Sequence, residues 1–440
     1  MEPRNEIEDS VNSHQSASVS LRVACLCGMT MFMAGFDAQN IGYVVPAIGD
    51  AWMVDRTDFA PVFAAGLLGI MIGALVGGPA ADRMGRRPVL LVSTVCFGVG
   101  SLCTLSVLSV DELIVVRWLT GFGVGGTMPN AIALTTEYSS PRRRTTVLML
   151  MFCGYSLGAA TAGVVAAALT ARFGWTGVFL VGGVVPCLVV FLLWAGLPES
   201  LQHLAAQRRQ HTPMTESDPI TSGEERRFPI AQLFTAGRAS TTLLLWVVFF
   251  MNLLVLHFVT AWLPTIVRDS GVPLDRAMLI TATFQAGGVA AAFPLGRLLD
   301  GAAPFRTLAV VYGAAGLFLV LIGASGSSVE LLFAGAFGAG VCILGGQLGA
   351  NALAALVYPT SSRATGVGWA LGVGRIGSVV GPVLGGFLLS LDWEYRLLFS
   401  LVTVPAIAAA SAAFGLHRMS RGLHPSEALN TPEPSPHRNE

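Results

Sequence analysis

The sequence predicts an all-α integral membrane protein in which twelve transmembrane helices form two bundles of six. Three observations support this prediction: a low charge content, a series of long apolar segments, and one long polar break in mid-chain. Of the 440 residues, 53% are hydrophobic and only 12% are charged, whereas soluble globular proteins carry about 25% charged residues. This composition excludes a soluble enzyme and a disordered protein. The net charge of zero also argues against a nucleic-acid partner.

Twelve segments are long and apolar enough to cross a bilayer, which takes a helix of about 20 residues. In chain order they are 21–47, 60–80, 88–108, 113–136, 146–169, 175–197, 240–265, 277–297, 307–325, 331–357, 366–390 and 397–416. The longest polar stretch inside the chain follows the sixth segment. The expected organisation is therefore an N-terminal tail (1–20), a first bundle (21–198), a linker (199–238), a second bundle (239–417) and a C-terminal tail (418–440).

The arginines predict the orientation of these segments. All 26 basic residues are Arg; 19 fall in the tails, the linker and the connections on one side, and five fall on the other side. Because basic residues are enriched in cytoplasmic loops, both termini and the linker are expected in the cytoplasm. The polar first twenty residues do not form a cleavable signal peptide. The protein is thus expected in the inner (plasma) membrane.

The two halves carry related motifs. Gly78-x-x-x-Asp82 follows the second segment, and Gly296-x-x-x-Asp300 follows the eighth. Gly154 lies eleven residues after Arg143, just as Gly374 lies eleven residues after Arg363. Two parallel repeats predict a substrate path between the halves, near the middle of the membrane.

Three charged residues lie inside apolar segments, away from their ends, and a charge near the bilayer centre costs at least about 2.5–3.5 kcal/mol. Asp37 either binds and releases a proton or forms a fixed ion pair with an arginine. Arg117 either contacts Asp37 or extends to the membrane surface. Arg375 has no acidic neighbour in sequence. It therefore binds either an anionic ligand, which a guanidinium can hold through two hydrogen bonds, or an acidic partner such as Asp37.

Glu137 ends the fourth segment, shortly before three consecutive arginines at 142–144. It is either part of a cytoplasmic gate or a simple interfacial ion pair. The residues expected to couple transport to protons are Asp37, Arg117 and Glu137.

Polar residues in the apolar segments are the candidates for substrate binding. His257 either titrates near neutral pH or is a hydrogen-bonded packing residue. Asn130 and Asn351, at repeat-equivalent positions, either face the substrate path or bridge helices, and Gln347 either lines an aromatic site or packs in the core. The full set of substrate-binding candidates is Arg375, Arg117, Asn130, Gln347, Asn351 and His257.

The connection between the second and third segments reads Gly78-Pro-Ala-Ala-Asp82-Arg83-Met-Gly85-Arg86-Arg87. Gly78 is expected to allow close helix contact, Gly85 to allow a tight turn, and Asp82 to pair with a helix end or an arginine. This stretch resembles the signature loop of the major facilitator superfamily. The residues expected to gate a conformational change are Gly78, Asp82, Arg83, Gly85, Arg86, Arg87, Asp300 and Arg363.

Further stretches are similar to the aromatic acid:H⁺ symporter family and together cover most of the chain. They are Gly35-Phe36-Asp37, Arg117 through Asn130, Glu137 to Arg144, Leu197-Pro198-Glu199-Ser200, Arg363 to Gly368, and Gly374-Arg375 through Gly386. The resemblance implies inward symport of a small aromatic carboxylate, of the hydroxybenzoate or hydroxyphenylpropionate class, with protons and by alternating access. It also implies a monomer in the lipid bilayer, with no cofactor beyond the coupling proton and no enzymatic activity.

The resemblance also implies site residues. The positions that match those important for transport are Asp37, Asp82, Arg117, Glu137, Asp300, Arg363 and Arg375. The family typically has an acidic residue three positions before the aspartate of the first helix. Here that position is Ala34, which leaves Asp37 as the only carboxylate within the first segment.

Two other functions compete with this one. Drug/H⁺ efflux antiporters usually carry a Gly-Pro-rich fifth helix, but residues 154–163 contain no proline. A receptor that senses aromatic acids without transporting them would need a signalling domain, for which the linker is too short.

Overall fold

The computed structural model describes residues 17–139, 144–201, 203–204, 233–234, 238–299, 301, 303–358, 363–391 and 393–422. Most of the two predicted tails, most of the predicted linker, and Asp300 lie outside these residues. The described part consists of helices and short connections, without strands.

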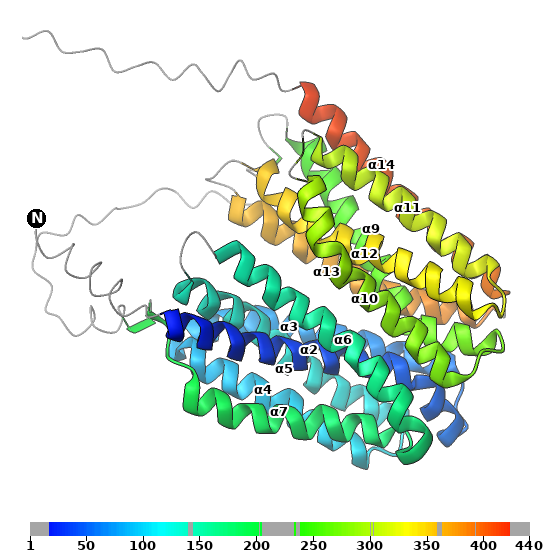
Figure 1. The fold of residues 1–440 in the computed structure, drawn as a ribbon, viewed down its shortest axis with the longest axis horizontal. Helices are drawn as coiled ribbons and strands as arrows, with labels where there is room; N and C mark the ends of the chain where they lie inside the picture. The colour runs from blue at the N-terminus through cyan, green and yellow to red at the C-terminus, as the bar shows by residue number, and fades with distance from the viewer. Residues whose placement is uncertain are drawn as a thin grey trace, which may run out of the picture.

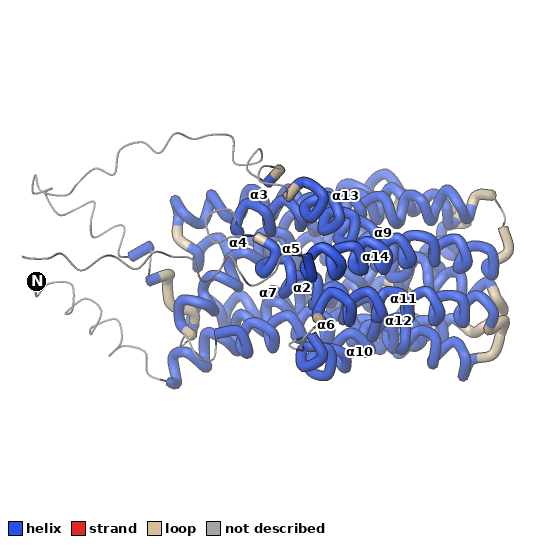
Figure 2. Tube along the Cα trace, turned by 90° about the horizontal axis from the view of Figure 1, so that it is seen from above, coloured by secondary structure: helices blue, strands red, loops and turns tan. Residues whose placement is uncertain are grey.

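Twelve long helices confirm the twelve predicted segments within the described residues. The first half forms α2 (Ala17–Trp52), α3 (Ala60–Met84), α4 (Arg86–Cys103), α5 (Val110–Tyr138), α6 (Arg144–Phe173) and α7 (Thr176–Gly196). The second half forms α9 (Ala239–Asp269), α10 (Leu274–Leu299), α11 (Pro304–Ala324), α12 (Val329–Val357), α13 (Arg363–Leu389) and α14 (Tyr395–Gly422). The helices run along the molecule and their connections gather at its two ends (Figure 2).

Ten of these helices, counted over the described residues, are long and apolar enough to cross a membrane. The other two long helices, α5 and α10, are not among these ten. α5 packs against α2, α3 and α4, and α10 packs against α6, α9 and α12.

Because each half has an even number of helices, α2 begins and α14 ends at the same end of the molecule. We call this end the termini side and the opposite end the far side. On the far side, α2 is joined to α3 through the short 3₁₀ helix η1 (Arg56–Phe59). The Asp55 side chain caps η1 by accepting hydrogen bonds from the N–H (2.9 Å) and hydroxyl (2.8 Å) of Thr57. These bonds hold the pKa of Asp55 below its ordinary value.

The two bundles are inclined to each other and converge toward the far side (Figure 1). The pairs of helices that join them are α2 with α9, α6 with α10, and α3 with α13. One continuous apolar core combines residues of the first bundle with far-side residues of the second. A separate core, which includes Leu245, Tyr312 and Ala413, fills the termini-side half of the second bundle. The bundles are thus joined along their far halves.

Ion pairs between the bundles lie on the far side. Arg268 of α9 donates to the carbonyl oxygen of Pro46 (3.0 Å) and pairs with Asp50 of α2 (2.5 Å). The neighbouring Asp269 pairs with Arg56 of η1. Adjacent residues of opposite charge at the end of α9 therefore meet complementary charges from the first bundle.

A close backbone approach also joins the bundles. A Cβ atom at Gly42 of α2 would lie 2.7 Å from the carbonyl oxygen of Thr260 in α9. Real Cβ atoms do not come so close to a backbone oxygen, so any side chain here must push the two helices apart. Gly28, on the same helix, faces open space.

We expect Gly42→Ala to separate the far-side ends of the bundles, whereas Gly28→Ala leaves them in place. The measurement is the distance between spin labels at Met53 and Arg276, both of which are exposed on the far side, in a background free of the seven native cysteines. Identical distance distributions in the two variants would show that Gly42 does not hold the bundles together.

Candidate functional site

A pocket lies between the two bundles at the middle of the helices. The first bundle supplies its walls from α2, α3, α5 and α6, and the second bundle from α9 and α13. Most of the lining is apolar and includes Ile41, Val62, Phe63, Leu67 and Ile70. The polar residues of the lining are Asp37, Gln39, Arg117, Tyr155, His257, Thr260 and Arg375.

Asp37 and Arg117 form a buried ion pair in the pocket wall. Both residues are almost completely inaccessible to solvent, and Arg117 Nη1 lies 3.7 Å from Asp37 Oδ2. Arg117 also donates to the backbone carbonyl of Asp37 (3.0 Å) and to Asn40 Oδ1 (3.2 Å). The Asn40 amide donates in turn to Asp37 Oδ1 (3.3 Å). Arg117 therefore contacts Asp37, as one of the two predictions had it, and does not extend to the membrane surface.

This network leaves buried polar atoms unsatisfied. Asp37 Oδ2 and Arg117 Nε have no hydrogen-bond partner among the described residues. Buried polar groups in proteins are nearly always hydrogen-bonded, so unpaired ones need an explanation. A second polar species that enters the pocket would supply the missing partners.

Arg375 enters the pocket from α13, in the opposite bundle. Its guanidinium makes no hydrogen bond or ion pair with any described residue, Asp37 included. The position of this cation in an apolar pocket fits the prediction of an anionic ligand better than that of a fixed acidic partner.

Tyr155 of α6 was not predicted from the sequence, yet it lines the pocket near both Asp37 and Arg375. A lone tyrosine in an apolar segment carries no signal of its own. The internal repeat does carry one, because Tyr155 follows Gly154 as Arg375 follows Gly374. The two repeats thus place an aromatic hydroxyl and a guanidinium at equivalent positions on opposite walls.

His257 of α9 also lines the pocket. Its Nδ1 atom lies 2.9 Å from the carbonyl oxygen of Leu253, one turn earlier. Since a carbonyl oxygen can only accept, Nδ1 is the donor in this bond.

The three remaining substrate-binding candidates lie away from the pocket lining. Asn130 donates to the carbonyl oxygens of Gly77 (3.3 Å) and Gly126 (2.8 Å) and so bridges α5 to α3. Gln347 links two other amides, because it accepts from Asn252 (2.7 Å) and donates to Asn351 (2.9 Å). These residues connect helices in this conformation.

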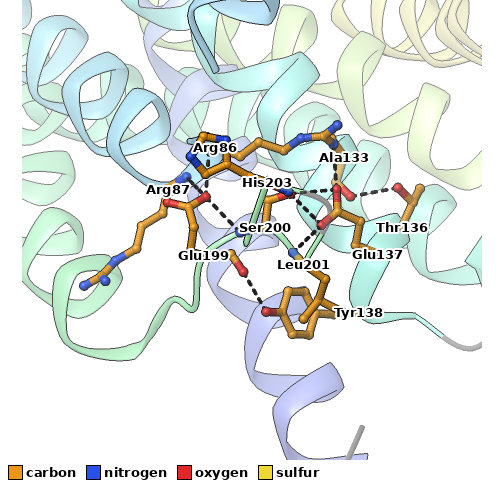
Figure 3. Close-up of polar contacts among 10 residues, drawn as sticks. All are labelled: Arg86, Arg87, Ala133, Thr136, Glu137, Tyr138, Glu199, Ser200, Leu201 and His203. Atoms are coloured by element: carbon orange, nitrogen blue, oxygen red, sulfur yellow. Dashed lines mark hydrogen bonds and ion pairs between the residues drawn. The ribbon is translucent and has the colours of Figure 1, made fainter. Parts of the chain in front are cut away.

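Glu137 and the signature loop form a second polar cluster on the termini side of the first bundle (Figure 3). Glu137 accepts from the hydroxyl of Ser200 (2.8 Å) and the N–H of Leu201 (2.9 Å), and pairs with Arg86 (3.1 Å). The described partners of Glu137 thus come from the signature loop and the segment after α7. Arg142 and Arg143 lie outside the described residues.

Glu199 is the centre of this termini-side cluster. Its Oε1 atom accepts from the backbone N–H groups of Arg86 (2.8 Å), Arg87 (3.2 Å) and Ser200 (2.8 Å). Two of these groups are at the start of α4, where free N–H groups favour a carboxylate. The Tyr138 hydroxyl donates to the backbone carbonyl of Glu199 (2.7 Å). The segment after α7 thus joins the ends of α4 and α5.

Two predictions about the signature loop were wrong. Asp82 was expected to pair with a helix end or an arginine, but it is exposed and has no ion-pair partner among the described residues. Glu199 caps the helix instead. Gly78 was expected to allow close helix contact, but a Cβ atom there would meet nothing within 4 Å. The neighbouring Gly77 makes the contact, because a Cβ atom there would lie 2.9 Å from Gly126 Cα.

Gly85 has the role that was predicted for it. Its φ of 99° and ψ of 154° fall in a region that is accessible essentially only to glycine. A Cβ atom at this position would also lie 2.6 Å from Glu199 Oε2. Of the last two gating candidates within the described residues, Arg83 is exposed and Arg363 begins α13.

Comparison with known proteins identifies relatives of this chain. The model of the Major Facilitator Superfamily matches residues 27–322 and 245–437. A gallate transporter of Pseudomonas putida is 38% identical over 424 residues, which cover 92% of this chain and 94% of the relative. The 3-(3-hydroxy-phenyl)propionate transporter of Escherichia coli K12 is 38% identical over 379 residues, which cover 86% of this chain and 89% of the relative.

A solved structure has the same fold. It is that of a bacterial homologue of the human lysosomal transporter Spinster, in an inward-facing and occupied conformation. The TM-score is 0.72 at 17% identity, and the match covers 91% of this chain and 97% of the other.

We expect Gly85→Ala to lower the free energy of unfolding by about 1–3 kcal/mol, because alanine cannot adopt this backbone conformation without strain. Its Cβ atom would also displace the Glu199 carboxylate from α4. Thermal unfolding of the purified protein in detergent measures the effect. Gly78→Ala, in the same loop, is the matched control and should unfold at the wild-type temperature; equal losses in both variants would contradict the assignment.

Proposed function

The chain belongs to the major facilitator superfamily, whose members are transporters and not enzymes, and we propose that it is a proton-coupled symporter that imports aromatic carboxylates. The proposed substrates are of the hydroxybenzoate or hydroxyphenylpropionate class, as the names of the relatives suggest. The many apolar helices make the chain a multi-pass membrane protein, as a transporter must be.

The observation that carries the proposal is the pocket between the bundles, where unpartnered polar atoms project into an apolar lining. Small-molecule sites have this character: an apolar body with a few polar groups that fix the orientation of the ligand. An aromatic acid is complementary to it, with an apolar ring and one anionic end. The two bundles contribute different parts of the pocket, so their relative movement can open it to either side of the membrane.

Arg375 is the proposed binding group for the substrate carboxylate. It is the pocket cation that makes no ion pair with a described residue, whereas Arg117 is already engaged by Asp37 and Asn40. A planar guanidinium offers a carboxylate two parallel hydrogen bonds. Tyr155, on the opposite wall, can donate a further hydrogen bond to the same anion.

Asp37 is the proposed proton-binding group. When its carboxyl group takes up a proton, the ion pair with Arg117 loses one of its charges, and the Arg117 guanidinium is released toward the pocket. Protonation of Asp37 therefore strengthens the positive field that attracts an anionic substrate. This links proton binding to substrate binding within one pocket.

The proposed cycle has the termini side in the cytoplasm, in agreement with the bias of the arginines. The bundles are joined on the far side, by ion pairs and by the approach of Gly42 to Thr260. This arrangement corresponds to a conformation in which the pocket is closed to the periplasm. Opening of the far side and closing of the termini side would complete alternating access.

We expect Asp37→Asn to abolish accumulation of the substrate against its gradient, because an amide cannot carry the proton. Labelled benzoate, 4-hydroxybenzoate and 3-(3-hydroxyphenyl)propionate are offered to proteoliposomes with an imposed pH gradient. Exchange of internal for external substrate, which needs no net proton movement, should survive. Proton-driven accumulation at the wild-type level in this variant would rule out Asp37 as the proton carrier.

We expect Arg375→Lys to raise the apparent KM about tenfold or more, because an ammonium cannot reproduce the paired hydrogen bonds of a guanidinium. Arg306→Lys, on the exposed start of α11, is the control and should transport as the wild type. An unchanged KM in Arg375→Lys would argue against direct contact with the carboxylate.

A further inference from the structure

His257 is positioned to recognise a part of the substrate other than its carboxylate. It lines the same pocket as Arg375, on the neighbouring helix of the same bundle. Its Nδ1 atom is occupied by the carbonyl oxygen of Leu253 at 2.9 Å. Its own backbone carbonyl accepts from the Thr260 hydroxyl at 3.3 Å. The backbone and one ring nitrogen are therefore fixed within α9.

The other ring nitrogen, Nε2, remains available for a hydrogen bond with a ligand in the pocket. No described residue makes a hydrogen bond to it. Because Nδ1 donates to Leu253, the neutral imidazole presents Nε2 as an acceptor with a free lone pair. An acceptor with no protein partner, at the wall of an apolar pocket, selects for a ligand that carries a hydrogen-bond donor.

The charged groups of the pocket and Tyr155 offer a different chemistry. Arg117 and Arg375 can only donate, and the Tyr155 hydroxyl can donate to an anion. Asp37 is an acceptor, but it carries the charge that pairs with Arg117, and it is the proposed proton-binding group. His257 Nε2 is thus a neutral acceptor in a pocket whose lining also includes the Gln39 side chain, and it lies near the carboxylate-binding Arg375.

We propose that His257 Nε2 accepts a hydrogen bond from a ring hydroxyl of the substrate and so selects hydroxylated aromatic acids over unsubstituted ones. This inference rests on the proposed function and adds a specificity-determining residue to it. With the carboxylate at Arg375 and the hydroxyl at His257, the ring lies against the apolar wall of α3, formed by Val62, Phe63 and Leu67. Two helices of one bundle then fix both polar ends of the substrate.

The test compares acids that differ in donor capacity. Competitors of labelled 4-hydroxybenzoate uptake into proteoliposomes are 3- and 4-hydroxybenzoate, the corresponding methoxybenzoates, and benzoate. A methoxy group keeps the oxygen but has no hydrogen to donate. The wild type should prefer the better-placed hydroxybenzoate over its methoxy counterpart and over benzoate, and this comparison needs no variant.

Two substitutions then assign the preference to His257. His257→Leu should reduce the preference for the hydroxylated acid over benzoate about threefold to tenfold, the effect of one hydrogen bond. His257→Gln retains an acceptor oxygen and should restore most of the preference. Both variants are compared with the wild type after purification and size-exclusion chromatography.

The possible failures are distinguishable. If the wild type transports hydroxylated and unsubstituted acids equally well, or if His257→Leu keeps the full preference, the role of His257 is overturned and the proposed function stands. Loss of proton-driven uptake of every acid in both folded variants would also overturn it, in favour of a proton-carrying histidine. If the wild type transports none of these acids, the proposed function itself fails.

Discussion

Asp37 and Arg117 are buried together at the centre of the first bundle, and the organisation of the pocket follows from this ion pair. Either charge alone would be strongly destabilising in such a place, because desolvation of an unpaired charge costs several kcal/mol. The pair holds α2 to α5, and Asn40 completes the network from one turn further along α2. α2 also contacts α6 and α9. A change in the charge of Asp37 therefore acts on a helix that touches both bundles.

The contacts that close the far side differ in strength. Asp50 and Arg56 keep 60% and 48% of their side chains exposed, and exposed ion pairs contribute only about 0–1 kcal/mol each. Shape complementarity around Gly42 and the shared apolar core supply the rest. An interface of this kind can be specific without being permanent, as a protein with two alternating conformations requires.

The fold could be predicted from the sequence because hydropathy is a local property, and each apolar segment became one helix. Asp37, Arg117 and Arg375 were found for a related reason: a charge in an apolar segment is costly and therefore conspicuous. Tyr155 carries no such cost and is recognised only through its repeat relation to Arg375. Which face of a helix a glycine occupies is not visible in a motif either, so Gly78 was assigned the contact that Gly77 makes. The sequence did not reveal that Glu199 caps the start of α4, because Glu199 lies far from α4 along the chain.

The cluster around Glu199 has a consequence for how the protein is made. The start of α4 and the carboxylate of Glu137 emerge from the ribosome well before Glu199, Ser200 and Leu201, which satisfy them. Until then, water on the termini side can form hydrogen bonds with these polar groups. All the groups of this cluster belong to the first half of the chain, so its hydrogen bonds need no residue of the second bundle.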